Sequence, residues 1–197
     1  MSIRSKNMRI IKNKYITELI FKKVDNGFVI PLTDEEQNAI DLGWKDFASM
    51  ANRDAPEGKV FAVPKEIAEQ MQEQISGDAL KDIASHKIKL WQEETDPTKK
   101  GELINLAIIT MAKSVALGIG PFGFFNLAVL LDTVGRNDDS IEILKQFLDE
   151  KRDYKYDNEL LKETLEKMTK IATEKINKGN AMSLSITTEN ELFFSLS

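Results

Sequence analysis

The stretch of residues 122–150, FGFFNLAVLLDTVGRNDDSIEILKQFLDE, constrains the fold more than any other part of the chain. In its first half, apolar side chains recur at the spacing of one helix face; they are Phe124, Leu127, Ala128 and Leu131. A helix with such a stripe is stable only when the stripe packs against another element. The pattern therefore predicts an amphipathic helix with a close neighbour.

A turn and a second helix follow in the same stretch. Gly135 ends the first helix at a position where a left-handed backbone carries no Cβ penalty. Asp139 is placed to cap the second helix, because Glu142 follows three residues later as in a capping box. The sequence thus predicts a helical hairpin, an element that stacks on neighbours and presents surfaces to partners.

Over residues 121–154 this hairpin resembles a tetratricopeptide repeat. The matching positions are Phe124, Leu127, Ala128, Leu131, Gly135, Ser140 and Leu144. The chain departs from the family pattern at Phe147, where the family prefers a small residue, and no proline follows near Arg152. A repeat array would show the pattern again after about 34 residues, but both shifts place charged or polar residues on core positions. The resemblance implies a single repeat-like hairpin with a protein-binding role; a generic helical hairpin fits the same residues.

The most apolar part of the chain is residues 103–131, where Lys113 is the only charged residue. A run of about 20 apolar residues is long enough to span a bilayer. Glycines and a proline at positions 118–123 divide this run into two arms that are each shorter than a spanning helix. We expect two buried core helices, with a membrane-associating apolar hairpin as the alternative.

Residues 15–30, YITELIFKKVDNGFVI, predict a β-hairpin. Their side chains fall on two alternating faces, and Asn26-Gly27 is the dipeptide that favours a tight primed turn. A helix through Ile11, Tyr15 and Leu19 is the competing interpretation.

The rest of the chain is mainly helical in pattern. Thr33 and Glu36 form a capping box at the start of one helix, and Gly77-Asp78 separates two others. The predicted helices span 33–50, 64–75, 79–92 and 157–178, with a loop at 95–101. Residues 182–197 return to an alternating pattern and predict a second hairpin.

These elements predict a mainly α (α+β) fold. We expect a bundle of about six helices with a small antiparallel sheet formed by the N- and C-terminal hairpins. The length of 197 residues suits a single domain over 1–197, with 1–14 as a candidate flexible basic arm.

The charge of the chain is distributed unevenly. Residues 1–23 contain seven basic side chains and one acidic side chain, a net of +6, so the total of −5 leaves −11 for the remainder. A basic arm on an acidic body suits nucleic acid or another anionic partner. The residues that would carry a nucleic-acid interface are Arg4, Lys6, Arg9, Lys12 and Lys14. The alternative is a solvated strand whose lysines oppose sheet aggregation.

The sequence contains no catalytic or metal-binding motif that we recognise. With no cysteine, it has no disulfide, thiolate nucleophile or cysteine-ligated metal. Phosphate-binding loops, nucleophile elbows and paired histidine ligands are absent. His86 lies one helical turn after Asp82, a pair that suits general-base catalysis but more often forms a helix-surface hydrogen bond. We expect no cofactor, no metal and no enzymatic activity.

The function expected from the sequence is a non-catalytic protein–protein interaction or assembly module. Phe125 is predicted to point away from the apolar stripe of its helix, so Phe125 and Phe122 are the candidate partner contacts. Nucleic-acid binding through the basic arm is the alternative, and membrane association of the apolar hairpin is a further one. The first residues lack the apolar run of a secretory signal, so we expect a cytoplasmic protein.

Overall fold

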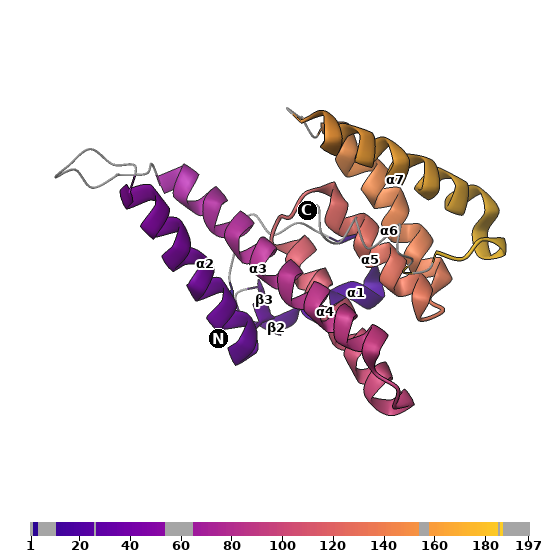
Figure 1. Ribbon diagram of the computed structural model, residues 1–197, viewed down its shortest axis with the longest axis horizontal. Helices are drawn as coiled ribbons and strands as arrows, with labels where there is room; N and C mark the ends of the chain where they lie inside the picture. Colours follow the sequence, from indigo (N-terminus) through magenta and orange to yellow (C-terminus); the bar gives the residue numbers. More distant parts are fainter. Residues whose placement is uncertain are drawn as a thin grey trace.

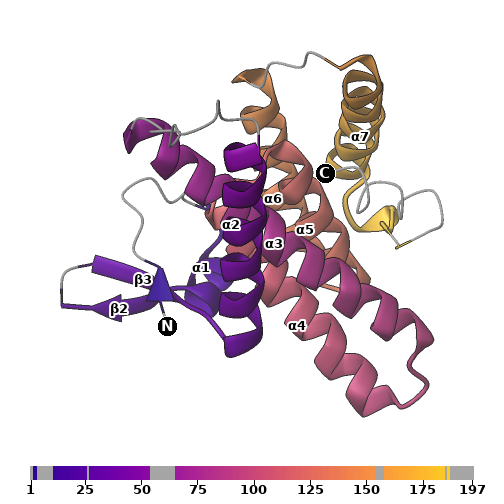
Figure 2. The same ribbon diagram turned by 60° about the vertical axis from the view of Figure 1, so that its left-hand side comes forward.

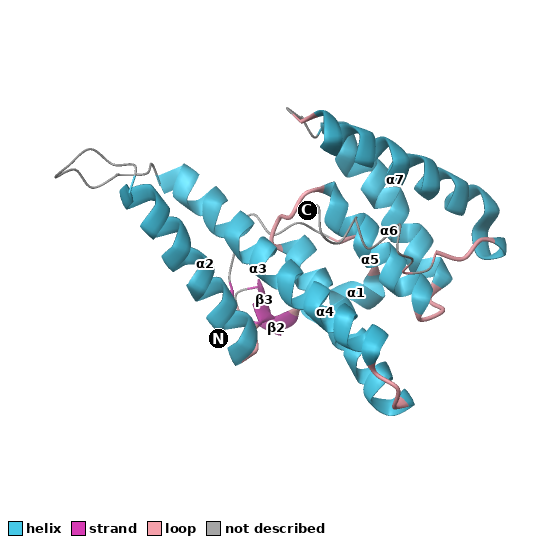
Figure 3. Ribbon diagram, in the orientation of Figure 1, coloured by secondary structure: helices cyan, strands magenta, loops and turns pink. Residues whose placement is uncertain are grey.

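The computed structural model describes residues 2–3, 11–25, 27–53, 65–153, 158–184 and 186. Within them, seven α-helices account for most of the chain and three short strands form a small antiparallel sheet (Figures 1 and 3). The predicted class, mainly α with a minor β element, is confirmed. The elements are β1 (Ser2–Ile3), α1 (Lys14–Ile20), β2 (Lys22–Val24), β3 (Gly27–Pro31), α2 (Asp34–Arg53), α3 (Lys65–Glu93), α4 (Pro97–Ala116), α5 (Pro121–Thr133), α6 (Asn137–Glu150), the 3₁₀ turn η1 (Lys151–Asp153), α7 (Glu159–Lys178) and the 3₁₀ turn η2 (Gly179–Ala181).

Helix α5 forms the centre of the core. Every residue from Pro121 to Asp132 is buried, as expected for a helix that is apolar on all sides. Each helix from α2 to α7 packs against the next one along the chain, and α5 contacts α4, α6 and α7. Within the described residues, no helix combines the length and the apolar character that crossing a bilayer requires.

The helical hairpin predicted around Gly135 is formed by α5 and α6. Gly135 has φ +79°, the left-handed conformation that ends a helix. Helix α6 begins at Asn137, so the prediction that Asp139 is its N-cap is wrong. The Asp139 carboxylate instead lies 2.7 Å from the Arg136 guanidinium, and an acidic residue in the first turn is favoured by the helix dipole. The resemblance to a tetratricopeptide repeat stays a prediction.

The N-terminal strand predicted over residues 15–22 is wrong for most of its length. Residues 14–20 form α1, whose first turn is capped because the Asn13 side chain accepts a hydrogen bond from the Ile16 N–H at 2.9 Å. Ile16 and Ile20, one turn apart, are both buried. The burial of this i, i+4 pair favours the competing helical interpretation over alternation.

A shorter hairpin remains in the predicted place. β2 and β3 pair antiparallel around the turn before Gly27, and β1 pairs with the other edge of β3, in the order β1–β3–β2. The hairpin projects to the left of the long helices in Figure 2, while Val29 and Ile30 of β3 are buried. The expected pairing with a C-terminal hairpin lies outside the described residues, because of residues 182–197 only 182–184 and 186 are described.

The predicted helix break at Gly77-Asp78 is also wrong, since α3 is continuous from Lys65 to Glu93. A Cβ atom on Gly77 would lie 2.6 Å from Cγ2 of Ile119. The Ser114 hydroxyl on α4 also donates a hydrogen bond of 2.5 Å to the Gly77 carbonyl. Gly77 therefore allows α3 to pack closely against the end of α4 and the connection that follows it, which contains Ile119, and it does not end α3.

Three helix ends follow local sequence signals. Thr33 precedes α2 as predicted, and Gly179, with φ +56°, ends α7 as predicted. The expected loop at 95–101 is shorter than predicted, because Asp96 caps α4 by accepting hydrogen bonds from the N–H groups of Thr98 and Lys99. Pro97 is then the first helical residue, a position that lacks a helical N–H partner in any case.

Candidate functional site

The two phenylalanines predicted as partner contacts lie in the core. Phe125 is 0% exposed and Phe122 is 5% exposed. The Phe125 ring packs edge-on against Phe147 of α6, with 5.6 Å between the ring centroids. The prediction that Phe125 points out of the core is wrong. The face of α5 that contains Phe125 is also covered, because Phe147 of α6 packs against it. These side chains stabilise the hairpin and do not form an accessible surface.

The other candidate residues are spread over the surface or fall outside the described residues. Arg4, Lys6 and Arg9 are outside them, whereas Lys12 and Lys14 are exposed beside the start of α1. His86 and Asp82 are both exposed on α3. Among the described residues, no three His, Asp or Glu side chains come together in a way that could hold a metal ion.

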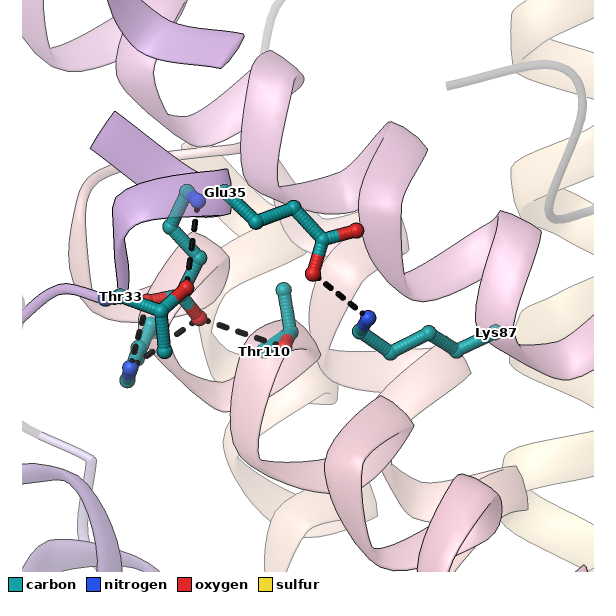
Figure 4. Close-up of polar contacts among 6 residues, drawn as sticks. Thr33, Glu35, Lys87 and Thr110 are labelled. Atoms are coloured by element: carbon teal, nitrogen blue, oxygen red, sulfur yellow. Dashed lines mark hydrogen bonds and ion pairs between the residues drawn. The ribbon is translucent and has the colours of Figure 1, made fainter. Parts of the chain in front are cut away.

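A buried ion pair joins Glu36 of α2 to Lys113 of α4, and Figure 4 labels Thr33 and Thr110, which contact the same carboxylate. The Nζ atom of Lys113 lies 2.7 Å and 3.0 Å from the two carboxylate oxygens of Glu36, and both side chains are almost fully buried. Glu36 also closes the predicted capping box: its carboxylate accepts from the Thr33 N–H at 2.9 Å, and its own N–H donates to the Thr33 hydroxyl at 3.2 Å. The Thr110 hydroxyl donates to the same carboxylate at 3.3 Å. One carboxylate therefore caps α2 and neutralises the only charge in the apolar run.

The neighbouring residue forms a second ion pair of similar length on the surface. Glu35 lies 2.8 Å from Lys87 of α3, and the Glu35 side chain is 57% exposed (Figure 4). Further along α3, burial raises the pKa of the Asp78 carboxyl above its ordinary value; Lys81 opposes the shift and Asp82 adds to it. Burial therefore destabilises the ionised form of Asp78, and the attraction of Lys81 offsets only part of this cost.

Polar contacts also attach α1 to α6. The Asn13 side-chain amide donates to Asp139 at 2.9 Å and to Glu142 at 2.5 Å. Arg136, which pairs with Asp139, stacks over the Tyr15 ring with 3.3 Å between its guanidinium carbon and the ring centroid. These contacts position the start of α1, which follows the basic arm, on the acidic N-terminal turn of α6.

Among the described residues, the most deeply buried ion pair links α5 to α7. The Nζ atom of Lys175 lies 2.5 Å from the Asp132 carboxylate, and both side chains are 0% exposed. Lys175 also donates to the main-chain carbonyl of Met182 at 2.5 Å, while the second carboxylate oxygen of Asp132 accepts from the Leu184 N–H. The pair therefore holds the main chain of the segment that follows α7.

Helices α2 and α3 extend beyond the core as a two-helix arm (Figure 1). We define the α2–α3 arm as residues 41–49 and 71–75, among which no side chain is buried. Its large apolar side chains include Leu42, which is 59% exposed, and the half-buried Trp44, Phe47 and Ile75. Trp44 contacts the core, and it packs edge-on against Phe47 with 6.0 Å between the ring centroids. Two helices alone leave part of each apolar stripe in contact with water.

Sequence reasoning missed the buried ion pairs and the arm. Lys113 offered a signal, because a lone charge in an apolar run must find a partner inside the core. Asp132 offered a weaker signal as the first acid after that run. Nothing local marks Lys175, which is one of several lysines along α7.

Comparisons with known proteins found no protein-family model, no curated protein and no solved structure that matches this chain.

Proposed function

We propose that the protein is a non-catalytic interaction or assembly module that binds its partner through the α2–α3 arm. The observation that carries this proposal is the apolar surface of the arm, where Leu42 is 59% exposed and Phe47 and Ile75 are only half-buried. Apolar stripes of this kind are stable when a third helix covers them. The partner surface that fits is the apolar face of another helix, from a different protein or from a second copy.

The buried charges of the core support a structural role. Glu36, Lys113, Asp132 and Lys175 are paired with one another or with main-chain groups, so each is part of the scaffold. His86, the only histidine, is exposed on α3. The described residues therefore give more support to a binding role than to general acid–base chemistry.

The arm is tested with Phe47→Asp, which places a charge among half-exposed apolar side chains without opening the core. The control is Leu160→Asp on α7, because Leu160 is an apolar side chain of 55% exposure outside the arm. Burial of one aromatic side chain contributes about 1.5–3 kcal/mol, so we expect at least tenfold weaker association for Phe47→Asp and unchanged association for the control. Circular dichroism verifies that both variants are folded.

Association is measured in two ways. Light scattering across a concentration series reports self-association, and quantitative affinity capture from the native host reports partners that depend on the arm. A protein that neither self-associates nor captures any partner sensitive to Phe47→Asp would refute the proposal.

A second candidate function is nucleic-acid binding, and the β2–β3 hairpin favours it. Lys22 and Lys23 on β2 are exposed, and Phe28, directly opposite Lys23 in register, is 57% exposed. Exposed aromatic rings beside lysines are the elements with which proteins stack bases and neutralise phosphates. Lys12 and Lys14 add two further exposed positive charges.

This candidate is tested by fluorescence anisotropy with a labelled single-stranded oligonucleotide over a salt series. Phosphate contacts predict that log K falls linearly with log salt, with a slope of about −0.7 for each contact with a single strand. We expect Phe28→Ala with Lys23→Gln to weaken binding, and Lys167→Gln with Lys170→Gln on the exposed face of α7 to leave it unchanged. Equal weakening by both double variants, or no binding at low salt, would refute a specific interface.

A further inference from the structure

The described residues that follow η2, 182–184 and 186, lie against the core, and no described strand pairs with them. Met182 has extended backbone angles of φ −119° and ψ 127°. Met182 and Ile186 are half-buried against the core, Leu184 is 4% exposed, and Ser183 between them is exposed. Alternate side chains thus point inward, as they do along one face of a β-strand.

Side chains, rather than a strand, satisfy the main chain of this segment. Lys175 donates to the Met182 carbonyl at 2.5 Å, and Asp132 accepts from the Leu184 N–H. We call Asp132 and Lys175 together the clamp. A neighbouring strand would bond a carbonyl and an N–H in the same way, so the two charged side chains replace a strand edge at this point.

The cost of burying this pair indicates that its main-chain contacts matter. A fully buried ion pair contributes little net stability by itself, since the loss of hydration of the two charges offsets their attraction. Hydrogen bonds to an ionised group are stronger than those between neutral groups. Both charges of the clamp form such bonds with the segment. The pair is therefore suited to holding an extended main chain.

We propose that the clamp is a binding site for an extended peptide, which the chain's own residues 182–184 occupy. The site recognises one carbonyl, the N–H two residues later, and an apolar side chain at the position of Leu184. A separate peptide with the same alternation binds when the chain's own segment is released. This site lies at α5 and α7, so it is independent of the function proposed for the α2–α3 arm.

The attachment of the segment to α7 determines how the site must be tested. The turn η2 joins the segment directly to α7, and such a short connection gives an attached segment an effective concentration of at least the millimolar range. A free peptide at tens of micromolar therefore competes poorly in the wild-type chain. The full-length variant Leu184→Asp weakens the attached segment while it leaves Asp132 and Lys175 in place, and Leu184→Ser serves if the aspartate variant does not fold.

The probe is a fluorescein-labelled peptide with the sequence of residues 180–190, NAMSLSITTEN, titrated with each full-length protein and followed by anisotropy. We expect binding to Leu184→Asp that is at least tenfold tighter than binding to the wild type. A control peptide with the same Leu184→Asp change is expected not to bind. If the folded variant does not bind the probe, or binds both peptides equally, the proposal is refuted.

Hydrogen exchange of the wild-type chain provides a second measurement that needs no variant. The Leu184 amide is expected to exchange at least tenfold more slowly than an unprotected amide, because it donates to the buried Asp132 carboxylate. Exchange of Leu184 at the unprotected rate would show that the segment does not occupy the clamp, and it would refute the proposal.

Discussion

The ion pairs of Glu35 and Glu36 offer a direct test of what burial does to a charge pair. The two residues are adjacent on α2, and each carboxylate lies close to one lysine: 2.8 Å for Glu35–Lys87 and 2.7 Å for Glu36–Lys113. The Glu35 side chain is 57% exposed, whereas that of Glu36 is 3% exposed. Because the two distances are nearly equal, variants that each break one of the pairs should differ in stability only through the environment of that pair.

The informative change is Glu36→Gln, which preserves the size of the side chain and removes its charge. The buried ammonium of Lys113 is then left without a counter-charge, and removal of one partner from a buried pair costs about 3–5 kcal/mol. Glu35→Gln breaks a surface pair in which Glu35 is 57% and Lys87 15% exposed, and the cost of breaking a surface pair is about 0–1 kcal/mol. In a chain of this length, a loss of 1 kcal/mol in stability lowers the melting temperature by about 2–4 °C. Glu36→Gln is therefore expected to lower the melting temperature by roughly 10 °C.

The free energy of unfolding is measured by urea denaturation, followed by tryptophan fluorescence, since Trp44 and Trp91 lie on α2 and α3. Thr33→Ala removes the hydroxyl of the capping box and leaves the Glu36–Lys113 ion pair in place, so it measures the contribution of the cap alone. Loss of an N-cap costs about 1 kcal/mol. Equal denaturant slopes across the set are required before the free energies are compared.

The double variant Glu36→Gln with Lys113→Met completes the test. Replacement of a whole buried pair by uncharged residues is often neutral, so the double variant is expected to recover most of the loss. The reasoning would be refuted if Glu36→Gln cost no more than Glu35→Gln, or if Lys113→Met failed to rescue it.

Three further predictions concern packing, pH and the attachment of α1. Gly77→Ala is expected to lower the free energy of unfolding by about 1–3 kcal/mol, because the added Cβ overpacks against Ile119. Gly101→Ala is expected to raise it by up to about 1 kcal/mol, because no atom lies within 4 Å of the added Cβ. Chemical denaturation measures both free energies, and equal effects of the two variants would contradict this prediction. Because burial raises the pKa of Asp78 in the folded state, the folded state binds the proton more tightly and stability falls as pH rises through the window between the unfolded and folded pKa values. Asp78→Asn is therefore expected to stabilise the protein at neutral pH and to lose this advantage below that window, and a gain independent of pH would contradict the assignment. Asn13→Ala is expected to cost about 0.5–2 kcal/mol through loss of the cap and to speed hydrogen exchange in α1, and unchanged exchange there would show that other contacts hold the helix.

Features that depend on a few neighbouring residues were predictable from the sequence. The Thr33–Glu36 capping box, the break between the two apolar arms and the stop at Gly179 all occur where predicted. Each is decided by a side chain that bonds its own backbone or by a glycine with a positive φ. Such effects act within one helical turn, so they are visible without knowledge of the rest of the fold.

Features that depend on distant partners were not predictable. Residues 14–20 fit both an alternating and a helical pattern, and the helix is favoured by burial of Ile16 and Ile20 and by contacts of Asn13 with α6. Gly77 was interpreted as a helix break, although its role is to admit Ile119. In both cases the local sequence allowed two structures, and packing against residues distant in the sequence selected one.

The sequence by itself determined the helical class, the central hairpin and the need to bury the apolar run, because periodicity and helix ends are local properties. Tertiary structure alone decided that Phe125 is core, that Lys113 pairs with Glu36, and that Asp132 and Lys175 hold the segment after α7. The physical reason is that the energy of a charge or an aromatic ring depends on what surrounds it. Those surroundings come from residues far away in the chain.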